Sequence, residues 1–448
     1  MAKYKAYPEY KDSGVEWIDS IPSHWQVKPT FALCEALAKK NVGGAENNVL
    51  SLSYGSIIPR DVETNIGLLP ESFNTYQIIE YGDVILRLTD LQNDKKSLRV
   101  GLVKQKGIIT SAYLKLKAKN EINFYFLYRL LHSYDTTKVF YGMGGGLRQS
   151  MKFEDFRRLP LLLPPKEEQL NISAFLDHET AKIDNLIEKQ QQLIELLKEK
   201  RQAVISHAVT KGLNSNVRMK DSGIEWLGEV PEHWTVSTIK YIATFIGTGS
   251  TPKNSESFTD GDGIDWLSPG DFNDSLILRN AKKKITTQAV SNGDAKIYPK
   301  NSIVVIGIGA TLGKVAFVDH EFSCNQQINI ITPSEIVEHK YLTYSLLNQV
   351  EQMKQSSNAS TIGIMNQEKT KKIWIVFPPK DEQIKIASVL YQKEIEFDSL
   401  LNKSENQILL LQERLTALIS AAVTGKIDVR DWVASDMQDA EEPQETTA

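Results

Sequence analysis

The sequence predicts a mixed α/β protein that is built twice. We expect two similar domains joined by two long helices, which form an antiparallel coiled coil with an internal pseudo-two-fold repeat. Three observations predict this fold class: a segment near the start recurs in mid-chain, Pro164-Pro165 at the start of a helical stretch recurs as Pro378-Pro379, and the regions between show the same order of elements. A repeat of this quality decides the architecture before any local pattern does.

Length and composition set broad limits. The chain has 448 residues, of which 41% are hydrophobic and 24% charged, enough for two or three domains with sizeable cores. The longest uncharged apolar stretches, such as 303–310, are far shorter than the ~20 residues of a membrane span, and the start has no signal-peptide core. We expect a soluble, cytoplasmic protein without membrane contact. The two cysteines, Cys34 and Cys324, exclude a disulfide framework and a thiolate zinc site, so we expect buried free thiols and no metal.

The net charge of −4 is unevenly distributed. Residues 21–158 hold 19 Lys and Arg against 13 Asp and Glu, a net charge of +6, whereas residues 230–372 hold 14 of each. Residues 427–448 hold one Arg against seven acids, a net charge of −6. The end of the chain therefore reads as a disordered, solubilising tail on a slightly basic body.

The repeat defines the expected organisation. In chain order we predict a docking segment (1–20), a first α/β domain (21–158), a first helical region (159–213), a repeat of the docking segment (214–229), a second α/β domain (230–372), a second helical region (373–427) and an acidic tail (428–448).

Residues 11–27 recur as residues 220–236 with ten of seventeen positions identical. Each copy carries two tryptophans around a proline and a histidine, which predicts a compact loop docked on apolar surface, because indoles bury large areas. His24 and His233 have no second histidine, cysteine or paired acid nearby. That favours a structural histidine over a catalytic or metal-binding one.

Both domains show strand-like runs followed by a helical run. In the first domain the runs are 48–52, 84–88 and 108–116, then a helix at 124–133; in the second they are 265–268, 302–307, 315–318 and 327–331, then a helix at 341–354. We match 84–86 with 303–305, and 101–103 with 313–315. Between these matched runs the residues differ, as expected if two domains on one scaffold recognise different ligands.

The helical regions have a clear start and an apolar seam. Two prolines suit the turn before a helix, and Glu167 and Glu168 favour the positive end of the helix dipole. The apolar spacing fits heptads, with Gln190 as one polar position. The predicted seam consists of Ile183, Leu186, Ile187, Leu193, Ile194, Leu197 and Val204 on the first helix and Leu400, Leu401, Ile408, Leu411, Leu415 and Leu418 on the second.

The sequence contains no complete catalytic motif. The glycine-rich run 307–315 resembles a phosphate-binding loop, but Val315 stands where a hydroxyl is needed. A nuclease cluster of Asp83, Asp94 and Lys96 rests on an acid-x-Lys triplet that recurs elsewhere by chance. Adenine methyltransferase and serine hydrolase motifs are missing from the sequence. The sequence therefore predicts a protein without catalytic activity.

The sequence holds many more residues suited to binding nucleic acid than residues suited to catalysis. They are cations and amide or hydroxyl side chains, which make contacts to phosphates and base edges. A solvated loop is the simpler interpretation of each alone, and their recurrence in both domains favours DNA. In the first domain the candidates are Arg60, Arg87, Thr89, Asp90, Lys95, Lys96, Arg99, Tyr113, Arg148 and Gln149. In the second they are Thr251, Lys253, Ser268, Asp271, Thr311, Lys314, Asn325, Gln326, Gln327 and Ser360.

With these residues in view, the chain resembles the specificity subunit of type I restriction-modification enzymes over about residues 5–430. Pro-Pro-x-(Glu/Asp)-Glu-Gln opens a long helix that ends Ala-Val-Thr, twice, and looks like that family's conserved regions. The run 266–272, the run 309–316 and Asn325-Gln326 look like its target recognition domains. The first domain departs from these motifs, with 87–90 and 111–113 at the matching places.

The resemblance implies a non-catalytic subunit that binds double-stranded DNA and positions two methyltransferase and two motor-nuclease subunits. It implies no cofactor on this chain, with S-adenosylmethionine, ATP and Mg on those partners. It also implies that each domain recognises one half of a split target. The rival hypotheses are a stand-alone DNA-modifying enzyme and a helical scaffold that binds only proteins.

Geometry supports the resemblance independently. About 30 residues of helix span ~45 Å at 1.5 Å per residue, enough to separate two recognition domains by one DNA turn of ~34 to 36 Å.

Overall fold

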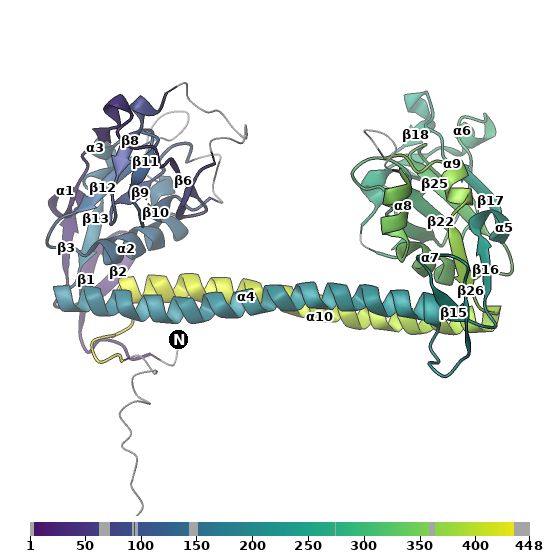
Figure 1. Cartoon of the computed structure of the whole chain (residues 1–448). Helices are drawn as coiled ribbons and strands as arrows, with labels where there is room; N and C mark the ends of the chain where they lie inside the picture. The colour runs from purple at the N-terminus through teal and green to yellow at the C-terminus, as the bar shows by residue number, and fades with distance from the viewer. Residues whose placement is uncertain are drawn as a thin grey trace, which may run out of the picture. The chain divides into compact units, whose positions relative to one another are not determined.

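The computed structural model describes residues 4–61, 72–91, 94, 97–142, 151–273, 275–357 and 363–433. The chain divides into two compact units: unit 1 holds residues 1–191 and 406–448, and unit 2 holds residues 192–405. Helices α4 (Lys166–Lys211) and α10 (Lys380–Val423) each contribute to both units (Figure 1). Each unit therefore contains one α/β domain together with part of each long helix.

The domain of unit 1 is built on a four-stranded sheet in the order β10-β9-β12-β4. Helix α2 (Phe124–Thr136) packs against it and supplies buried Phe126, Leu127 and Leu130 to the core. The sheet strands are β4 (Cys34–Glu35), β9 (Val84–Leu86), β10 (Val100–Leu102) and β12 (Leu114–Ala118). The remaining strands and short helices are β1 (Tyr10–Val15), β2 (Ile18–Pro22), β3 (Gln26–Pro29), α1 (Thr30–Leu33), β5 (Lys39–Lys40), β6 (Leu50–Ser53), β7 (Ser56–Pro59), β8 (Gln77–Ile79), β11 (Gly107–Ile109), α3 (Phe153–Phe156) and β13 (Pro160–Leu163).

The domain of unit 2 is built on a five-stranded sheet in the order β17-β25-β22-β23-β20, and helix α7 (His339–Leu347) packs against β22 and β23. The sheet strands are β17 (Ala243–Thr248), β20 (Ile277–Leu278), β22 (Ser302–Ile306), β23 (Val315–Val318) and β25 (Ile328–Pro333). The remaining elements are β14 (Met219–Asp221), β15 (Glu229–Pro231), β16 (Thr235–Thr238), α5 (Ile239–Ile242), β18 (Phe258–Thr259), β19 (Ile264–Leu267), β21 (Lys284–Ile285), α6 (Thr287–Ser291), β24 (Ser323–Cys324), α8 (Val350–Ser357), α9 (Gln367–Lys371) and β26 (Trp374–Phe377).

The predicted fold class is confirmed, because the same strand order appears in both domains. β4, β12, β9 and β10 of the first correspond to β17, β25, β22 and β23 of the second. One detail was wrong. Val100 pairs with Leu86 as Val315 pairs with Val305, so the match of 101–103 with 313–315 is out of register by three residues. Similar Gly-x-Val triplets lie before one strand and within the other.

Two boundaries also differ from the sequence prediction. The run 108–116 forms two strands, β11 and β12, rather than one. The helical run 341–354 is divided between α7 and α8. Cys34 and Cys324 are buried free thiols as predicted, and burial raises the pKa of the Cys34 thiol to about 12.

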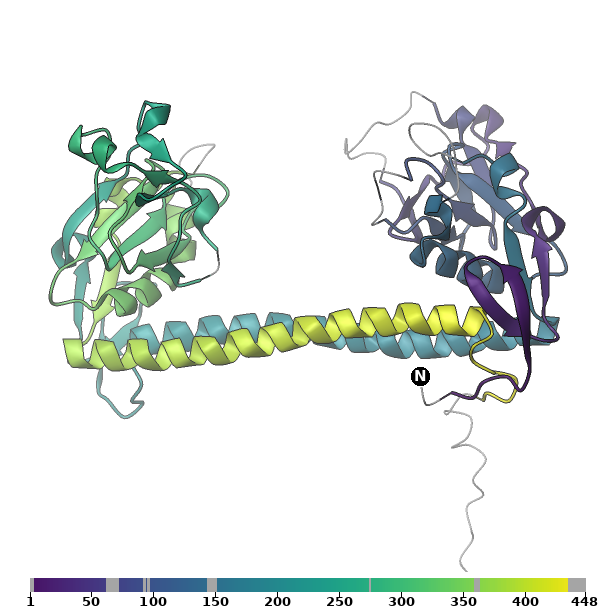
Figure 2. The same cartoon turned by 180° about the vertical axis from the view of Figure 1, so that it is seen from behind.

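The long helices pair antiparallel. In unit 1 the start of α4, with Phe175 and Ile183, shares one hydrophobic core with Leu411 and Leu418 near the end of α10. In unit 2 the end of α4 packs instead with the start of α10, where Ile205 and Val209 share a core with Ile386 and Leu390. Figures 1 and 2 show the two helices side by side in each unit.

The predicted seam is partly wrong. Ile183, Ile194, Leu411 and Leu418 are buried, and Ile187, Leu197, Val204, Leu401, Ile408 and Leu415 are half-buried. Leu186, Leu193 and Leu400 are 46%, 41% and 45% exposed. These three leucines have apolar spacing like that of the buried positions, and spacing alone does not show which apolar side chains face the partner helix and which face solvent.

The duplicated Glu-Gln pair at the start of each long helix joins the helix to its domain. Glu168 accepts hydrogen bonds from the indole N–H of Trp25 (2.8 Å) and from the hydroxyl of Tyr7 (3.1 Å), and its other oxygen lies 2.6 Å from Nε2 of His24. Gln169 donates to the carbonyls of Pro164 (2.8 Å) and Glu121 (3.1 Å). The docked loop is thus held by a carboxylate.

Unit 2 repeats this arrangement. Glu382 contacts Nε2 of His233 (2.8 Å) and the indole N–H of Trp234 (3.3 Å). Gln383 donates to the carbonyls of Pro378 (2.8 Å) and Ile336 (3.0 Å). Both histidines therefore bind a helix carboxylate, which agrees with the structural role predicted for them.

Candidate nucleic-acid interface

The β9–β10 loop, residues 87–99, contains most of the first domain's candidates. It leaves β9 at the edge of the core, and the backbone N–H of Arg87 donates to the carbonyl of Arg99 (2.9 Å), so the loop begins and ends as a hairpin. The guanidinium of Arg87 lies 3.5 Å from Asp94, and both side chains are partly exposed, at 32% and 25%. The Ser97 backbone N–H, which donates to Asp94, holds the pKa of that carboxyl below its usual range.

Arg99 does not lie on a surface. Its side chain is fully buried and cannot contact DNA in this structure, so the prediction of Arg99 as a DNA-binding residue is corrected. The sequence could not distinguish it from an exposed cation. Its guanidinium donates to the backbone carbonyls of Arg87 (3.2 Å), Thr89 (2.8 Å), Asp90 (3.2 Å) and Asp94, and its Nε donates to the hydroxyl of Tyr141 (3.0 Å).

The other candidates of the first domain are in different positions. Thr89 and Asp90 are half-buried within the loop. Arg60 is half-buried just after β7, and Tyr113 packs beside the buried Ile79 and Ile85. Lys95, Lys96, Arg148 and Gln149 lie outside the described residues.

In the second domain three chain segments meet at the end of β17. The backbone N–H of Ser250 donates to the carbonyl of Cys324 (2.8 Å), and the N–H of Asn325 donates to the carbonyl of Leu267 (2.9 Å). Gly249 permits this approach, because a Cβ there would lie 2.1 Å from the Cys324 carbonyl oxygen. The structure thereby brings together residues 249–251, 267–268 and 324–327.

Polar side chains line this meeting point. The hydroxyl of Thr251 bonds Oε1 of Gln326, and Gln327 N–H donates to Oδ1 of Asn325 (2.9 Å). Thr251, Gln326 and Gln327 are exposed, whereas Asn325 is 9% exposed. Amides and hydroxyls on an exposed rim are the groups that bond base edges and phosphates. This is the best-formed set of candidates in the described part of the chain.

Ser268 and Asp271 form the turn that follows β19, next to this meeting point. Asp271 accepts from the N–H and hydroxyl of Ser268 (2.8 and 2.7 Å) and from the N–H of Lys282 (2.9 Å). With three donors already on its carboxylate, Asp271 shapes the turn that presents Ser268 and Lys282. Lys253 is exposed on the preceding segment.

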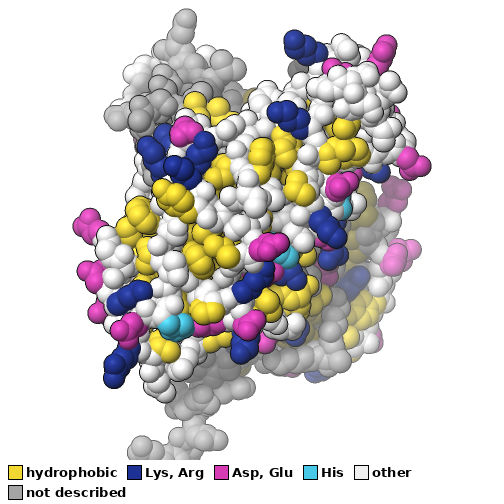
Figure 3. Space-filling model, turned by 90° about the vertical axis from the view of Figure 1, so that its right-hand side faces the viewer, with side chains coloured by type: hydrophobic (Ala, Val, Ile, Leu, Met, Phe, Trp, Pro, Cys, Tyr) yellow, Lys and Arg dark blue, Asp and Glu magenta, His cyan; other side chains and the backbone are white. Residues whose placement is uncertain are grey.

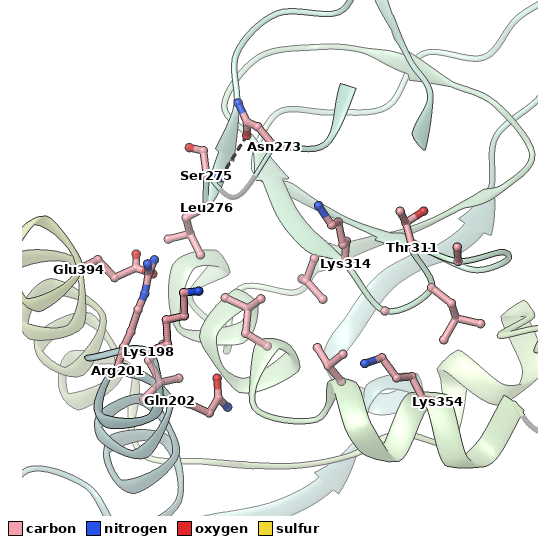
Figure 4. Close-up of a pocket in the computed structure, with 17 residues that line it drawn as sticks. Lys198, Arg201, Gln202, Asn273, Ser275, Leu276, Thr311, Lys314, Lys354 and Glu394 are labelled. Atoms are coloured by element: carbon pink, nitrogen blue, oxygen red, sulfur yellow. Dashed lines mark hydrogen bonds and ion pairs between the residues drawn. The ribbon is translucent and has the colours of Figure 1, made fainter. Parts of the chain in front are cut away.

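Thr311 and Lys314 line a pocket of about 410 Å³ in unit 2 (Figure 4). Its wall is formed by Lys198, Arg201 and Gln202 of α4 and by the 310–315 loop, and Lys354 of α8 completes the rim. Lys198 is paired with Glu195 (3.0 Å) and Lys354 with Glu351 (2.8 Å). Two of the lysines that line the pocket are therefore paired with acids on their own helices, and the pocket adjoins α4 and α10. Ser360 lies outside the described residues.

The sequence reasoning missed three lysines. Lys282 and Lys283 are exposed and Lys284 is half-buried, in the segment that Asp271 holds. A run of three consecutive lysines was the available signal. Trp266 belongs to the motif run 266–272, and its sequence context does not indicate its role: its indole N–H donates to the Ser250 carbonyl (3.1 Å) and so holds one of the three segments that meet here.

Charge and metal-binding capacity can be assessed over the described residues. On the face drawn in Figure 3, basic and acidic side chains are interspersed, and no large area of one sign covers it. Within the described ranges, no group of three or more His, Cys, Asp and Glu side chains could hold a metal ion. No described helix is long and apolar enough to cross a membrane.

Comparison with known proteins decides the family. A model of the type I restriction modification DNA specificity domain matches residues 95–196 and 231–410 of this chain. The chain belongs to this family. The first range runs from β10 to β13 and into α4, and the second runs from β16 to β26 and into α10.

Individual relatives carry the same family name. The MjaIX specificity subunit of Methanocaldococcus jannaschii is 31% identical over 189 residues, which are 41% of this chain and 42% of that subunit. The putative MjaX specificity subunit of the same organism is 27% identical over 429 residues, 92% of this chain and 96% of that protein. The second match runs through both halves of the repeat.

Solved specificity-subunit structures share the fold. A chain from a structural study of complex assembly and conformational transition in the type I restriction-modification system aligns with a TM-score of 0.71 at 16% identity, covering 91% of this chain and 99% of that one. The HsdS subunit of Thermoanaerobacter tengcongensis aligns with a TM-score of 0.52 at 16% identity, covering 91% and 98%. Both alignments extend over nine-tenths of this chain, so this chain shares the fold of these two structures.

Proposed function

We propose that this chain is the DNA sequence-recognition subunit of a type I restriction-modification complex and that each α/β domain recognises one half of a split target. One observation carries the proposal: the two central sheets share strand order and register, while the loops that leave the equivalent strands β9 and β22 differ in length and chemistry. The first loop is 87–99 and surrounds a buried arginine, and the second is a short glycine-containing turn, 307–314. A common scaffold with different loops suits two different half-sites.

The proposal includes the partners. Two methyltransferase and two motor-nuclease subunits assemble with the chain in the cytoplasm, and S-adenosylmethionine, ATP and Mg belong to those subunits. Exposed leucines on the long helices support a protein partner, because large apolar side chains at 41% to 61% exposure favour burial. They are Leu170, Leu186, Leu193, Leu196, Leu400, Leu409 and Leu410.

The long helices set the spacing of the half-sites in this proposal. α4 has 46 residues and α10 has 44, and at 1.5 Å per residue such helices extend for about 66 to 69 Å. The length is ample for domains that bind one DNA turn apart.

The test measures DNA binding and methyl transfer with and without the partner. The purified chain alone should transfer no methyl group and hydrolyse no ATP, and with its methyltransferase subunit it should shift a small subset of mixed duplexes. Methyl transfer by the isolated chain would favour a stand-alone enzyme. A complex that binds all duplexes equally, or none, would favour a protein-binding scaffold.

A further inference from the structure

Arg99 organises the β9–β10 loop from inside. The loop carbonyls of Arg87, Thr89, Asp90 and Asp94 all accept hydrogen bonds from its fully buried guanidinium. The carbonyls of Thr89 and Asp90 belong to the two planar peptide units on either side of the Asp90 Cα, so holding both also fixes the direction in which the Asp90 side chain leaves the backbone. Asp90 has φ +57°, a left-handed conformation that a non-glycine residue holds only when its surroundings enforce it.

The same side chain connects this loop with a second segment. Its Nε donates to the hydroxyl of Tyr141 (3.0 Å), and the guanidinium lies 5.3 Å from the centre of that ring. Ten residues further on, the backbone N–H of Met151 donates to the carbonyl of Leu88 (2.8 Å). Both flanks of the segment between Tyr141 and Met151 are therefore attached to the β9–β10 loop or to its buried arginine.

Arg99 is anchored on the core. Its backbone N–H donates to the carboxylate of Asp135 on α2 (2.6 Å), and the next residue, Val100, begins β10. A guanidinium offers five N–H donors in a rigid fork, whereas an ammonium offers three around one point. Lysine at this position would keep the charge and lose the geometry.

The second domain has no counterpart of this arrangement among its described residues. Ile306 N–H donates to the carbonyl of Lys314 (3.0 Å), as Arg87 N–H does to Arg99, so Lys314 occupies the equivalent position. Its loop is closed by backbone bonds instead, from Gly313 to Ile306 (2.9 Å) and from Leu312 to Gly309 (3.1 Å). Any effect of Arg99 should thus be confined to one domain.

We propose that Arg99 is a positioning residue that sets the shape of the β9–β10 loop and thereby determines which bases the first domain recognises, without itself contacting DNA. The inference rests on the proposed function of the chain. It assigns specificity to a buried side chain beneath the recognition surface. The second domain, whose described residues provide no such support, serves as an internal control within the same molecule.

The experiment selects bound duplexes from a randomised library, using the full chain together with its methyltransferase subunit. The variants are Arg99→Lys, Arg99→Met and Tyr141→Phe. Leu130→Ala is the matched control. Leu130 is a fully buried core residue of α2, and its side chain has no polar atom that could hydrogen-bond to the β9–β10 loop or to the segment after Tyr141. Thermal unfolding of each variant is measured in parallel.

We expect Arg99→Lys to lower base discrimination at one half-site by about tenfold, the range of one lost base contact, and to leave the other half-site unchanged. Tyr141→Phe should affect the same half-site less. Leu130→Ala should lower the unfolding temperature and keep both half-sites. If Arg99→Met fails to fold, the lysine and Tyr141 variants decide.

Three results would overturn the inference. One is an unchanged motif in Arg99→Lys. Another is equal loss at both half-sites in Arg99→Lys and in Leu130→Ala, which would make the role purely structural. The third is the absence of any split motif with the unmodified chain, which would overturn the proposed function itself.

Discussion

Glu168 and Glu382 occupy the same place in the repeat, yet they are unequally buried. The Glu168 side chain is 8% exposed and satisfies three partners, whereas that of Glu382 is 33% exposed and satisfies two. The sequence motif predicted where each helix begins. It did not reveal that the glutamate is the acceptor for the docked tryptophan, because the two are 143 residues apart in the chain.

Glu168→Ala should destabilise unit 1 by about 2 to 4 kcal/mol, because it leaves buried donors on Trp25 and Tyr7 without an acceptor. Glu382→Ala, the matched control in unit 2, should cost about 1 kcal/mol. Hydrogen exchange over residues 18–27 and 227–236 measures each loop separately. A larger loss of protection in the Glu382 variant would contradict this account.

The buried side chain of His132 should make the stability of the fold depend on pH. Burial, with the nearby Arg129 charge as a smaller cause, lowers its pKa from the ordinary 6.5 to about 4, and within the described structure its Nδ1 has no hydrogen-bond partner. The unfolded state takes up a proton near pH 6.5 and the folded state only near pH 4. Stability should therefore fall as the pH falls from 6.5 to 4 and then level off.

Denaturant unfolding at pH 7, 5.5 and 4.5 tests this expectation. His132→Leu should flatten the loss of stability across that window, and His207→Leu, at an exposed position on α4, should leave it unchanged. Equal slopes for the unmodified chain and His132→Leu would show that another group carries the pH dependence.

At the scale of elements, the helix pair is specified by more than apolar spacing. In unit 2 the guanidinium of Arg201 on α4 bonds Glu394 (2.7 Å) and Asp398 (2.9 Å) on α10, and Glu394 also accepts from the hydroxyl of Tyr344 on α7 (2.8 Å). Arg201 lies within the first helical region predicted from the sequence, 159–213. It could not supply the partner, because antiparallel pairing brings together residues 193 apart.

Arg201→Ala should destabilise unit 2 by about 3 kcal/mol, since it leaves the 10% exposed Glu394 carboxylate without its cationic partner. A double-mutant cycle with Glu394→Ala should give a coupling energy of about 1 to 3 kcal/mol. The control is the surface pair Lys198 and Glu195, at 57% and 69% exposure, which should couple by less than about 0.5 kcal/mol. Equal coupling for both pairs would refute the role of the buried network.

For the whole molecule, the duplication makes the fold class predictable from the sequence. The candidate DNA interface is less predictable. Strand order and the helix starts follow from patterns that occur twice, so each copy checks the other. The loops occur once each. Whether Arg99 is buried depends on Asp135 and Tyr141, which reach it from elements 36 and 42 residues away, and no local pattern encodes that contact.

The spacing role of the helices can be tested by insertion at the boundary between the units. Four residues are added between Gln191 and Gln192 and four between Glu405 and Asn406, so the contacts inside each unit are kept. The insertion adds ~6 Å and ~40° beyond a full turn. At ~3.4 Å per base pair, the spacer of the target should grow by one to two base pairs with both half-sites unchanged. Full activity on the original spacer would rule out this role.

The central claim is that each domain recognises its half-site independently. The most direct measurement exchanges residues 239–372, which lie between the paired strands β16 and β26, for the matching domain of another family member. The variant is expressed with its partner subunits, and the methylated sequences of the host genome are mapped. We predict that one half of the methylated target changes and the other half stays the same. A change in both halves, or in neither, would contradict the account.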